Sequence, residues 1–202
     1  MTMRIRKALT LAMISIATLG LVTPLAQADS TPTTCELLDK CNNGTDSCVF
    51  HPASRREFGG RRQHVGRTTY NCSSVNQIQG ISWADTDGGS NSLGISIDAS
   101  MKFAEVYTVS VSATYSHSWE WSHTVTRTDN LNTPAWGVGE IFHAPLMQTV
   151  TGNYELHFRK PFYGHYYWYV NNFSATSPLP NDGSVTFHTR AMTKDERNRC
   201  PR

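Results

Sequence analysis

Apolar and polar residues alternate strictly along two neighbouring stretches in the middle of the chain. From residue 92 to residue 103 the odd positions are apolar, and the even positions carry Ser, Gly, Asp or Lys. From residue 107 to residue 126 the odd positions are aromatic, aliphatic or His, and the even positions are Ser or Thr except for Glu120. Because successive side chains of a strand point to opposite faces, this period predicts strands with one apolar face and one hydroxyl-rich face.

Only Glu105 and Val106 interrupt the alternation between the two stretches. A single strand from residue 107 to residue 125 would reach about 60 Å, because a strand rises about 3.3 Å per residue. Strands usually run for about 3–10 residues, so two ordinary strands joined by a bulge or corner at residues 116–118 are the alternative. The sequence leaves both arrangements open.

Further strands are expected in the second half of the chain, at residues 150–158, 162–170 and 184–190. Turns are expected at residues 129–134 and 177–183, because both segments contain Pro and Asn. A short helical turn is expected at residues 35–41, and no amphipathic helix of three turns is apparent. The predicted fold class is therefore all-β, with an elongated antiparallel sheet or β-sandwich at residues 92–202 and a loop-rich region before it.

The start of the chain has the order of charged, apolar and small residues that is typical of a secretory signal peptide. Cleavage is expected after Ala28, which leaves a polar, Cys-rich and loop-rich leader at residues 29–91. The net charge of the whole chain is +2, and three of its positive charges lie in the signal peptide. The mature chain is therefore close to neutral and is expected outside the cell, with no nucleic-acid partner.

All five cysteines lie in the mature part of the chain, where an oxidising compartment allows disulfides to persist. Five is odd, so we expect two disulfides and one leftover thiol, with the pairing left open. A zinc site is the competing interpretation, but the spacing lacks the close cysteine pairs of zinc modules. The disulfide candidates are Cys35, Cys41, Cys48, Cys72 and Cys200.

The motifs of common catalytic and cofactor-binding sites are absent from the sequence, so no enzyme, cofactor or metal is predicted. His117 and His123 would lie about 20 Å apart on a straight strand, too far to share an ion. Residues 85–90 resemble a calcium loop but have Ser96 where the loop needs a bidentate Glu, so we expect a turn there. A hydrolase whose site is assembled only in space stays an alternative.

Two groups of residues are candidates for binding a partner protein. An aromatic cluster supplies the Tyr and Trp side chains that dominate interface energies, although such clusters often belong to the core. A group of arginines surrounds Gly59 and Gly60, although such a group is also typical of a solvated loop. The candidates are Tyr163, Tyr166, Tyr167, Trp168, Tyr169, Arg55, Arg56, Arg61 and Arg62.

The Ser/Thr-alternating stretches at residues 92–102 and 107–128, followed by residues 150–158, resemble the core of aerolysin and epsilon-toxin type proteins. The resemblance implies a secreted, elongated β-protein that oligomerises and inserts an amphipathic hairpin into membranes. The sequence departs from the family because the connection at residues 104–106 is very short. The layout as a whole is also similar to small exported proteins of actinobacteria, among them the adaptor subunits of umbrella toxin particles.

The leading hypothesis is a secreted, non-enzymatic adaptor that binds other secreted proteins in a toxin-like hetero-oligomer. Its polar leader at residues 29–34 could add a strand to the sheet of a partner. The alternative is a membrane-acting, pore-forming toxin in which residues 95–126 form the inserted hairpin. In that hairpin Glu120 faces the lumen, whereas Trp119 and Trp121 face lipid.

Overall fold

The computed structural model describes residues 31–201, so the predicted signal peptide lies outside the described residues. Residues from Pro32 onward form one compact unit. Its described part contains the helices α1 (Thr34–Asn42), α2 (Lys102–Tyr115) and α3 (Lys194–Asn198). Its strands are β1 (Ser47–Gly59), β2 (Gln63–Tyr70), β3 (Gln77–Gly88), β4 (Ser90–Asn91), β5 (Ser122–Thr133), β6 (Gly137–Ala144), β7 (Leu146–Phe162), β8 (His165–Pro178) and β9 (Ser184–Ala191).

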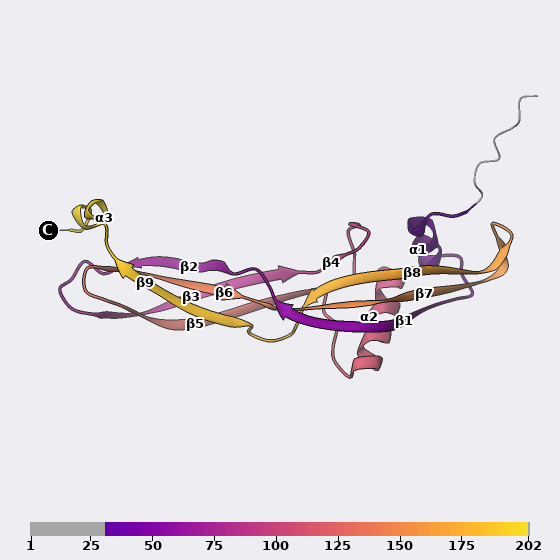
Figure 1. Cartoon of the computed structure of the whole chain (residues 1–202), viewed down its shortest axis with the longest axis horizontal. Coiled ribbons are helices and arrows are strands. Elements are labelled where there is room, and N and C mark those ends of the chain that lie inside the picture. Colours follow the sequence, from indigo (N-terminus) through magenta and orange to yellow (C-terminus); the bar gives the residue numbers. More distant parts are fainter. Residues whose placement is uncertain (1–30, 202) are drawn as a thin grey trace, which may run out of the picture. The chain divides into compact units, whose positions relative to one another are not determined.

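Three long runs of chain pass from one sheet into another within this unit (Figure 1). One sheet has the order β1-β7-β8-β4, and the next has the order β2-β6-β9. Strand β1 leads into β2, β6 into β7 and β8 into β9. The same three runs of chain therefore lie side by side in both sheets. The three runs change from one sheet to the other at residues 60–62, at Pro145 and at residues 179–183, between the ends of the strands.

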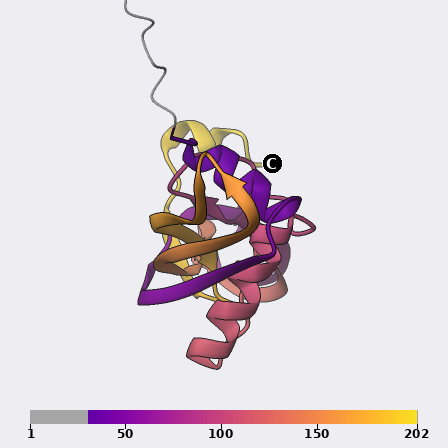
Figure 2. The same ribbon diagram turned by 90° about the vertical axis from the view of Figure 1, so that its right-hand side faces the viewer.

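Each part of the unit has its own hydrophobic core. Helices α1 and α2 lie on one side of the sheet that contains β7 and β8, as the end-on view in Figure 2 shows. Their apolar residues pack against those of the sheet in what we call the first core, which includes Phe50, Tyr107, Tyr154 and Phe173. The second core lies between the β2-β6-β9 sheet and the β3-β5 pair. It consists of Val65, Ile81, Trp83, Val125, Leu131 and Ile141.

The antiparallel all-β fold class predicted from the alternation is confirmed. Strand β7 buries its even positions from Gln148 to Phe158, as the period of residues 150–158 predicts. Strand β8 covers most of the aromatic cluster, and β9 begins and ends within one residue of the predicted strand at 184–190. The short helical turn predicted at residues 35–41 is the core of α1, which a capping box between Thr33 and Glu36 begins.

Three local predictions are wrong. Residues 102–115 form the helix α2, a helix of more than three turns in a stretch predicted to be strand. Residues 92–101 form no strand. Because residues 107–115 are helical and β5 begins only at Ser122, neither the long strand at 107–125 nor its two-strand alternative is present. Strand β5 extends through Thr133 and β3 through Gly88, where the sequence predicted turns at 129–134 and 85–90.

The region predicted as a loop-rich leader contains three long strands, β1, β2 and β3. They pair with β7, β6 and β5, so residues 29–91 and residues 92–202 share the same sheets. The sequence does not predict these three strands because few of their residues are buried. In β1, for example, Phe50 is the single buried residue.

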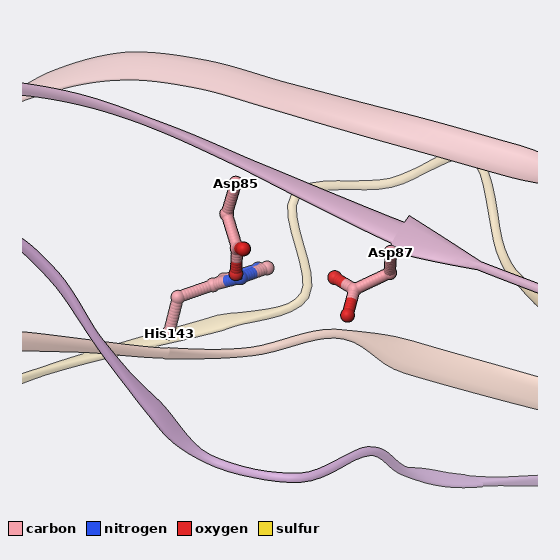
Figure 3. A group of neighbouring side chains, drawn as sticks. All are labelled: Asp85, Asp87 and His143. Carbon is pink, nitrogen blue, oxygen red and sulfur yellow. The ribbon is translucent and has the colours of Figure 1, made fainter.

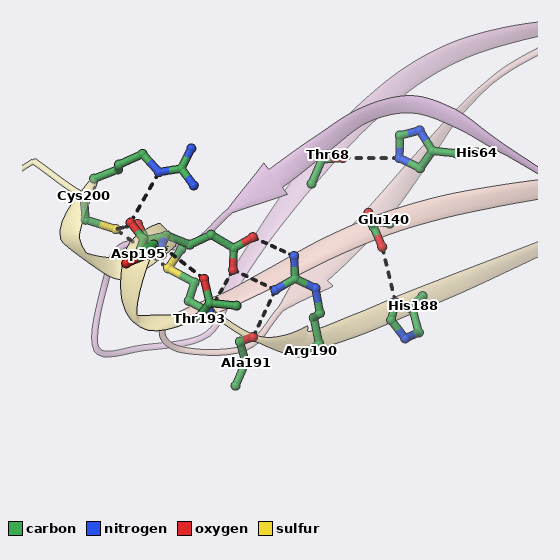
Figure 4. Close-up of polar contacts among 12 residues, drawn as sticks. His64, Thr68, Glu140, His188, Arg190, Ala191, Thr193, Asp195 and Cys200 are labelled. Atoms are coloured by element: carbon green, nitrogen blue, oxygen red, sulfur yellow. Dashed lines mark hydrogen bonds and ion pairs between the residues drawn. The ribbon is translucent and has the colours of Figure 1, made fainter.

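The disulfide prediction of two bridges and one leftover thiol is confirmed among the described residues. Cys41 pairs with Cys48, Cys72 pairs with Cys200, and Cys35 is free and exposed. The second bridge joins Cys200, just after α3, to Cys72, just after β2. Arg190 of β9 also bonds to a side chain of α3, as Figure 4 shows. Arg190 bonds both carboxylate oxygens of Glu196 at 2.6 and 2.7 Å, and this ion pair lowers the pKa of Glu196 to about 2.

Candidate functional site

The segment with alternating Ser and Thr residues connects two strands that are paired with each other. Strands β3 and β5 form an antiparallel ladder without a bulge, in which Gln77 faces Thr133 and Gly88 faces Ser122. Residues 89–121, which we call the tucked segment, leave the end of β3 and return to the start of β5. The tucked segment therefore occupies the place of a hairpin loop between two long strands.

The tucked segment is packed against the four-stranded sheet. It begins with β4, which pairs Ser90 with Thr176 of β8, and then turns at residues 92–101 into α2. The helix buries Phe103, Ala104, Tyr107 and Val111 in the first core, and Trp119 joins them after the helix ends. At this position the largest apolar side chains of the segment are hidden from solvent, whereas Val109 is exposed.

Hydrogen bonds from two buried tyrosines hold the segment to the sheet. The Tyr154 hydroxyl of β7 donates to the carbonyl oxygen of Phe103 at 2.9 Å. The Tyr107 hydroxyl of α2 donates to the carbonyl oxygen of Val150 in β7 at 2.8 Å. Burial raises the pKa of both tyrosines above the ordinary value of about 10, so both remain neutral donors at neutral pH.

Several features of the tucked segment are unfavourable for a helix. The N-cap residue of α2, Met101, makes no side-chain capping bond. The C-cap residue of α2, Ser116, has a φ of 51°, in the region that favours glycine. The buried atoms Nε2 of His117 and Nε1 of Trp119 have no hydrogen-bond partner among the described residues. An unpaired buried polar group costs about 1–3 kcal/mol, so the packed state of this segment is strained.

The ladder of β3 and β5 predicts how the tucked segment would pair if it extended both strands. The pairing is symmetric about Glu105, since Gly88 faces Ser122. Continued in this register, Leu93 faces His117, Ile97 faces Ala113 and Met101 faces Val109. Every apolar odd position then faces another odd position, and the hydroxyl-bearing even positions face one another. The turn falls at residues 104–106, where the alternation breaks.

A cluster of two carboxylates and one imidazole lies next to the start of the tucked segment. Asp85 and Asp87 of β3 and His143 of β6 offer ligand atoms that all lie within 4.8 Å of one another (Figure 3). His143 is completely buried, and its Nδ1 atom lies 2.6 Å from Oδ2 of Asp85. The sequence did not predict this group, because His143 is 58 residues from Asp85 and only the packing of β3 against β6 brings them together.

The predicted aromatic residues lie at the β7–β8 hairpin. Four tyrosines are 42–53% exposed, and they are Tyr163, Tyr166, Tyr167 and Tyr169. Trp168 is half-buried, packs against the first core and donates from Nε1 to the carbonyl oxygen of Phe162 at 2.8 Å. The tyrosines are thus available to a partner, whereas Trp168 belongs to the support of the hairpin.

The predicted arginines are distributed along β1 and the connection to β2. Arg55 is half-buried and bonds Gln148 and Glu57, whereas Arg56, Arg61 and Arg62 are exposed. Arg56 lies over the ring of Phe58, and Arg62 lies over the ring of Phe142. Three of the four arginines, Arg55, Arg56 and Arg62, therefore already use their guanidinium groups within the chain.

Comparisons with known proteins find loose structural similarity only. No protein-family model matches the chain, and no curated protein matches it in sequence. The parasporin-2 toxin of Bacillus thuringiensis, which recognizes cancer cells, is similar with a TM-score of 0.27 and 10% identity, over 71% of this chain and 74% of the toxin. The putative pore-forming toxin from Bacteroides vulgatus ATCC 8482 has a TM-score of 0.29 and 11% identity, over 74% of this chain.

The chain spans 59% of the length of the Bacteroides protein. At these identities and TM-scores nothing about function follows from either likeness. No helix in the described part of the chain is both long and apolar enough to cross a membrane. The candidate functional site is therefore defined by the geometry of the tucked segment itself.

Proposed function

We propose that this chain is a secreted, non-enzymatic, membrane-acting protein whose tucked segment leaves the core and inserts into a bilayer as a hairpin. The observation that carries the proposal is the register of β3 and β5. Continued through residues 89–121, that register produces one face that is apolar apart from Asn91, His117 and the turn residue Glu105, and one face of Ser, Thr and a few charged residues. An amphipathic hairpin of this kind can place lipid on one side and water on the other.

The length of the extended hairpin suits this role. Each arm would add about 15 residues to β3 or β5, and a transmembrane strand needs about 9–11 residues. Lys102 and Glu105 would lie at the turn, beyond the far side of the hydrocarbon. Trp119 and Trp121 would lie on the apolar face near the other end, where aromatic side chains favour the membrane interface.

A single hairpin in lipid leaves unpaired backbone groups along both of its edges. Since each unsatisfied backbone group in hydrocarbon costs several kcal/mol, insertion requires that hairpins from several copies pair side by side. The proposed active form is therefore an oligomer with a water-filled pore. Its lumen would be lined by the even positions, which include Asp98 and Glu120.

Ala113 and Thr114 offer a matched test of the proposal. Both are exposed near the end of α2, so a lysine at either position leaves the packed state intact. In the hairpin, Ala113 faces Ile97 on the lipid side near mid-membrane, and Thr114 faces the lumen. A lysine on the lipid face at the midplane costs about 2–4 kcal/mol, so Ala113→Lys should slow dye release from vesicles by at least about 30-fold.

The vesicles would be made of phosphatidylcholine and phosphatidylglycerol, and the melting temperature of each variant would be measured first. Thr114→Lys should melt like Ala113→Lys and release dye at nearly the rate of the unmodified chain. Equal loss of release in both variants would contradict the face assignment. Absence of release by the unmodified chain under oligomer-forming conditions would contradict membrane action.

The exposed tyrosines of the β7–β8 hairpin favour a second candidate function, that of an adaptor subunit in a secreted toxin-like assembly. Exposed Tyr side chains are enriched at protein interfaces, and the exposed thiol of Cys35 could link to another chain. The double variant Tyr166→Ser and Tyr169→Ser should then lose proteins that co-purify from the culture supernatant. A chain that elutes alone as a monomer at all concentrations would contradict the adaptor function.

A further inference from the structure

The buried imidazole of His143 is oriented by a fixed acceptor. Its Nε2 atom lies 3.1 Å from the carbonyl oxygen of Asp182, and a carbonyl oxygen can only accept a hydrogen bond. Nε2 therefore carries a hydrogen, which leaves Nδ1 as the nitrogen that is free to bind either a proton or a metal ion. A histidine that ligates a metal usually donates its other ring N–H to a carbonyl or carboxylate, as His143 does here.

Two carboxylates from one face of β3 lie close to the imidazole of His143. Asp85 and Asp87 are two residues apart, so their side chains lie on the same side of the strand. Oδ2 of Asp85 is 2.6 Å from Nδ1, and Gln63 donates from Nε2 to both Asp85 oxygens at 2.8 Å. Gln63 thus holds the Asp85 carboxylate in place, in the manner of a supported metal ligand.

The charges around this group call for a cation. The carboxylates of Asp85 and Asp87 project from the same side of β3, and their ligand atoms lie within 4.8 Å of each other. A divalent ion between the two carboxylates would remove their repulsion, because opposite charge within a few ångströms stabilises ionised carboxylates.

We propose that Asp85, Asp87 and His143 bind one divalent transition-metal ion of the zinc class. One imidazole nitrogen and two carboxylate oxygens suit zinc better than magnesium or calcium, which prefer sites made of oxygen alone. Zinc sites with three protein ligands hold a water molecule in the fourth position. On binding, the ion replaces the proton between Nδ1 of His143 and Asp85, and that proton is released to solvent.

The geometry needs only small movements to accept the ion. Zinc lies about 2.0–2.2 Å from nitrogen and oxygen ligands, so two ligand atoms of a tetrahedral site are about 3.3 Å apart. The contact between Nδ1 and Asp85 must open by less than about 1 Å to reach that separation. All three ligand atoms already lie within 4.8 Å of one another, so the Asp87 carboxylate closes the site by turning inward.

The test uses the full chain carrying Cys35→Ser, which removes the exposed thiol as a competing ligand, after dialysis against a chelator and removal of any affinity tag. Isothermal titration with ZnCl₂, together with metal analysis after equilibrium dialysis, should give one ion per chain. CoCl₂ should give a visible absorption band of the same stoichiometry. Asp87→Asn should weaken zinc binding by at least about tenfold and remove the cobalt band.

Asp182→Asn is the matched control. Its side chain is 71% exposed and faces Arg127 at 3.5 Å, while its backbone carbonyl, which orients His143, is unchanged. This variant should bind zinc like the unmodified chain, and both variants should keep the metal-free melting temperature to within a few degrees. Equal zinc affinity in Asp87→Asn and the unmodified chain, or no ion retained after dialysis, would overturn the proposal.

Discussion

At the scale of single residues, Tyr154 connects the tucked segment to the sheet beneath it. Its ring lies in the first core, with its centroid 4.8 Å from that of Phe50, and its hydroxyl reaches the backbone of Phe103 at the start of α2. A net contribution of about 0.5–1.5 kcal/mol is typical of one such hydrogen bond. Tyr154 thus favours the packed state of the segment without contributing to the proposed hairpin.

Tyr154→Phe should therefore lower the free energy of unfolding by about 0.5–1.5 kcal/mol at pH 7. It should also change the pH dependence. Because the pKa of Tyr154 is raised on folding, its stabilising effect is complete below about pH 10 and is lost as the pH rises above that value. Urea unfolding at pH 7 and at pH 11 should show a shallower alkaline decline in Tyr154→Phe.

The exposed Tyr169 provides the control for this measurement, since Tyr169→Phe removes a hydroxyl from a side chain that is 53% exposed. This variant should leave both the stability at pH 7 and the alkaline decline unchanged. If Tyr154→Phe declined as steeply as the unmodified chain, titration of Tyr154 would not be the cause of the alkaline loss.

At the scale of elements, α2 explains why the sequence predicted a strand where the fold has a helix. Phe103, Tyr107 and Val111 are spaced by four residues, and a spacing of four returns to the same face of a strand and nearly to the same face of a helix. The core therefore accepts the helix. The helix leaves other apolar odd positions outside, as the 62% exposure of Val109 shows, whereas a strand would group all of them.

Elements with one buried face were predictable, and elements without one were not. Strand β7 alternates from Gln148 to Phe158 because the core lies on one side of it, so residues 150–158 identify it directly. Strands β1 to β3 bury few side chains, and their pairing with distant strands decides their structure. The sequence could not predict the cluster at His143 for the same reason. Its three residues come together only when two sheets pack against each other.

The end of α2 supplies a prediction about the strain in this helix. Ser116 adopts a left-handed conformation, which costs a residue other than glycine about 1 kcal/mol. Ser116→Gly should stabilise the packed segment by about 0.5–1 kcal/mol, raise the melting temperature by a few degrees and slow dye release from vesicles. Ser118→Gly, an exposed change outside the helix, should not raise the melting temperature.

At the scale of the whole molecule, the proposal requires one segment to have two folds. In the packed state residues 107–115 follow the period of a helix, with Tyr107 and Val111 buried and Val109 exposed. In the inserted state the same residues must follow the period of a strand. The two periods assign opposite environments to Val109 and Ala113, which are exposed to water on α2 and would face lipid in the hairpin.

A scan with an environment-sensitive fluorophore can read this change of period. Single cysteines at residues 108–114, in a chain carrying Cys35→Ser, would each be labelled and measured in solution and on vesicles. On vesicles, labels at residues 109, 111 and 113 should report an apolar environment, and labels at 110, 112 and 114 an aqueous one. In solution the helical pattern should hold. A helical pattern that persists on vesicles would mean that α2 binds the membrane surface without refolding, and the strained features of the tucked segment would then need another explanation.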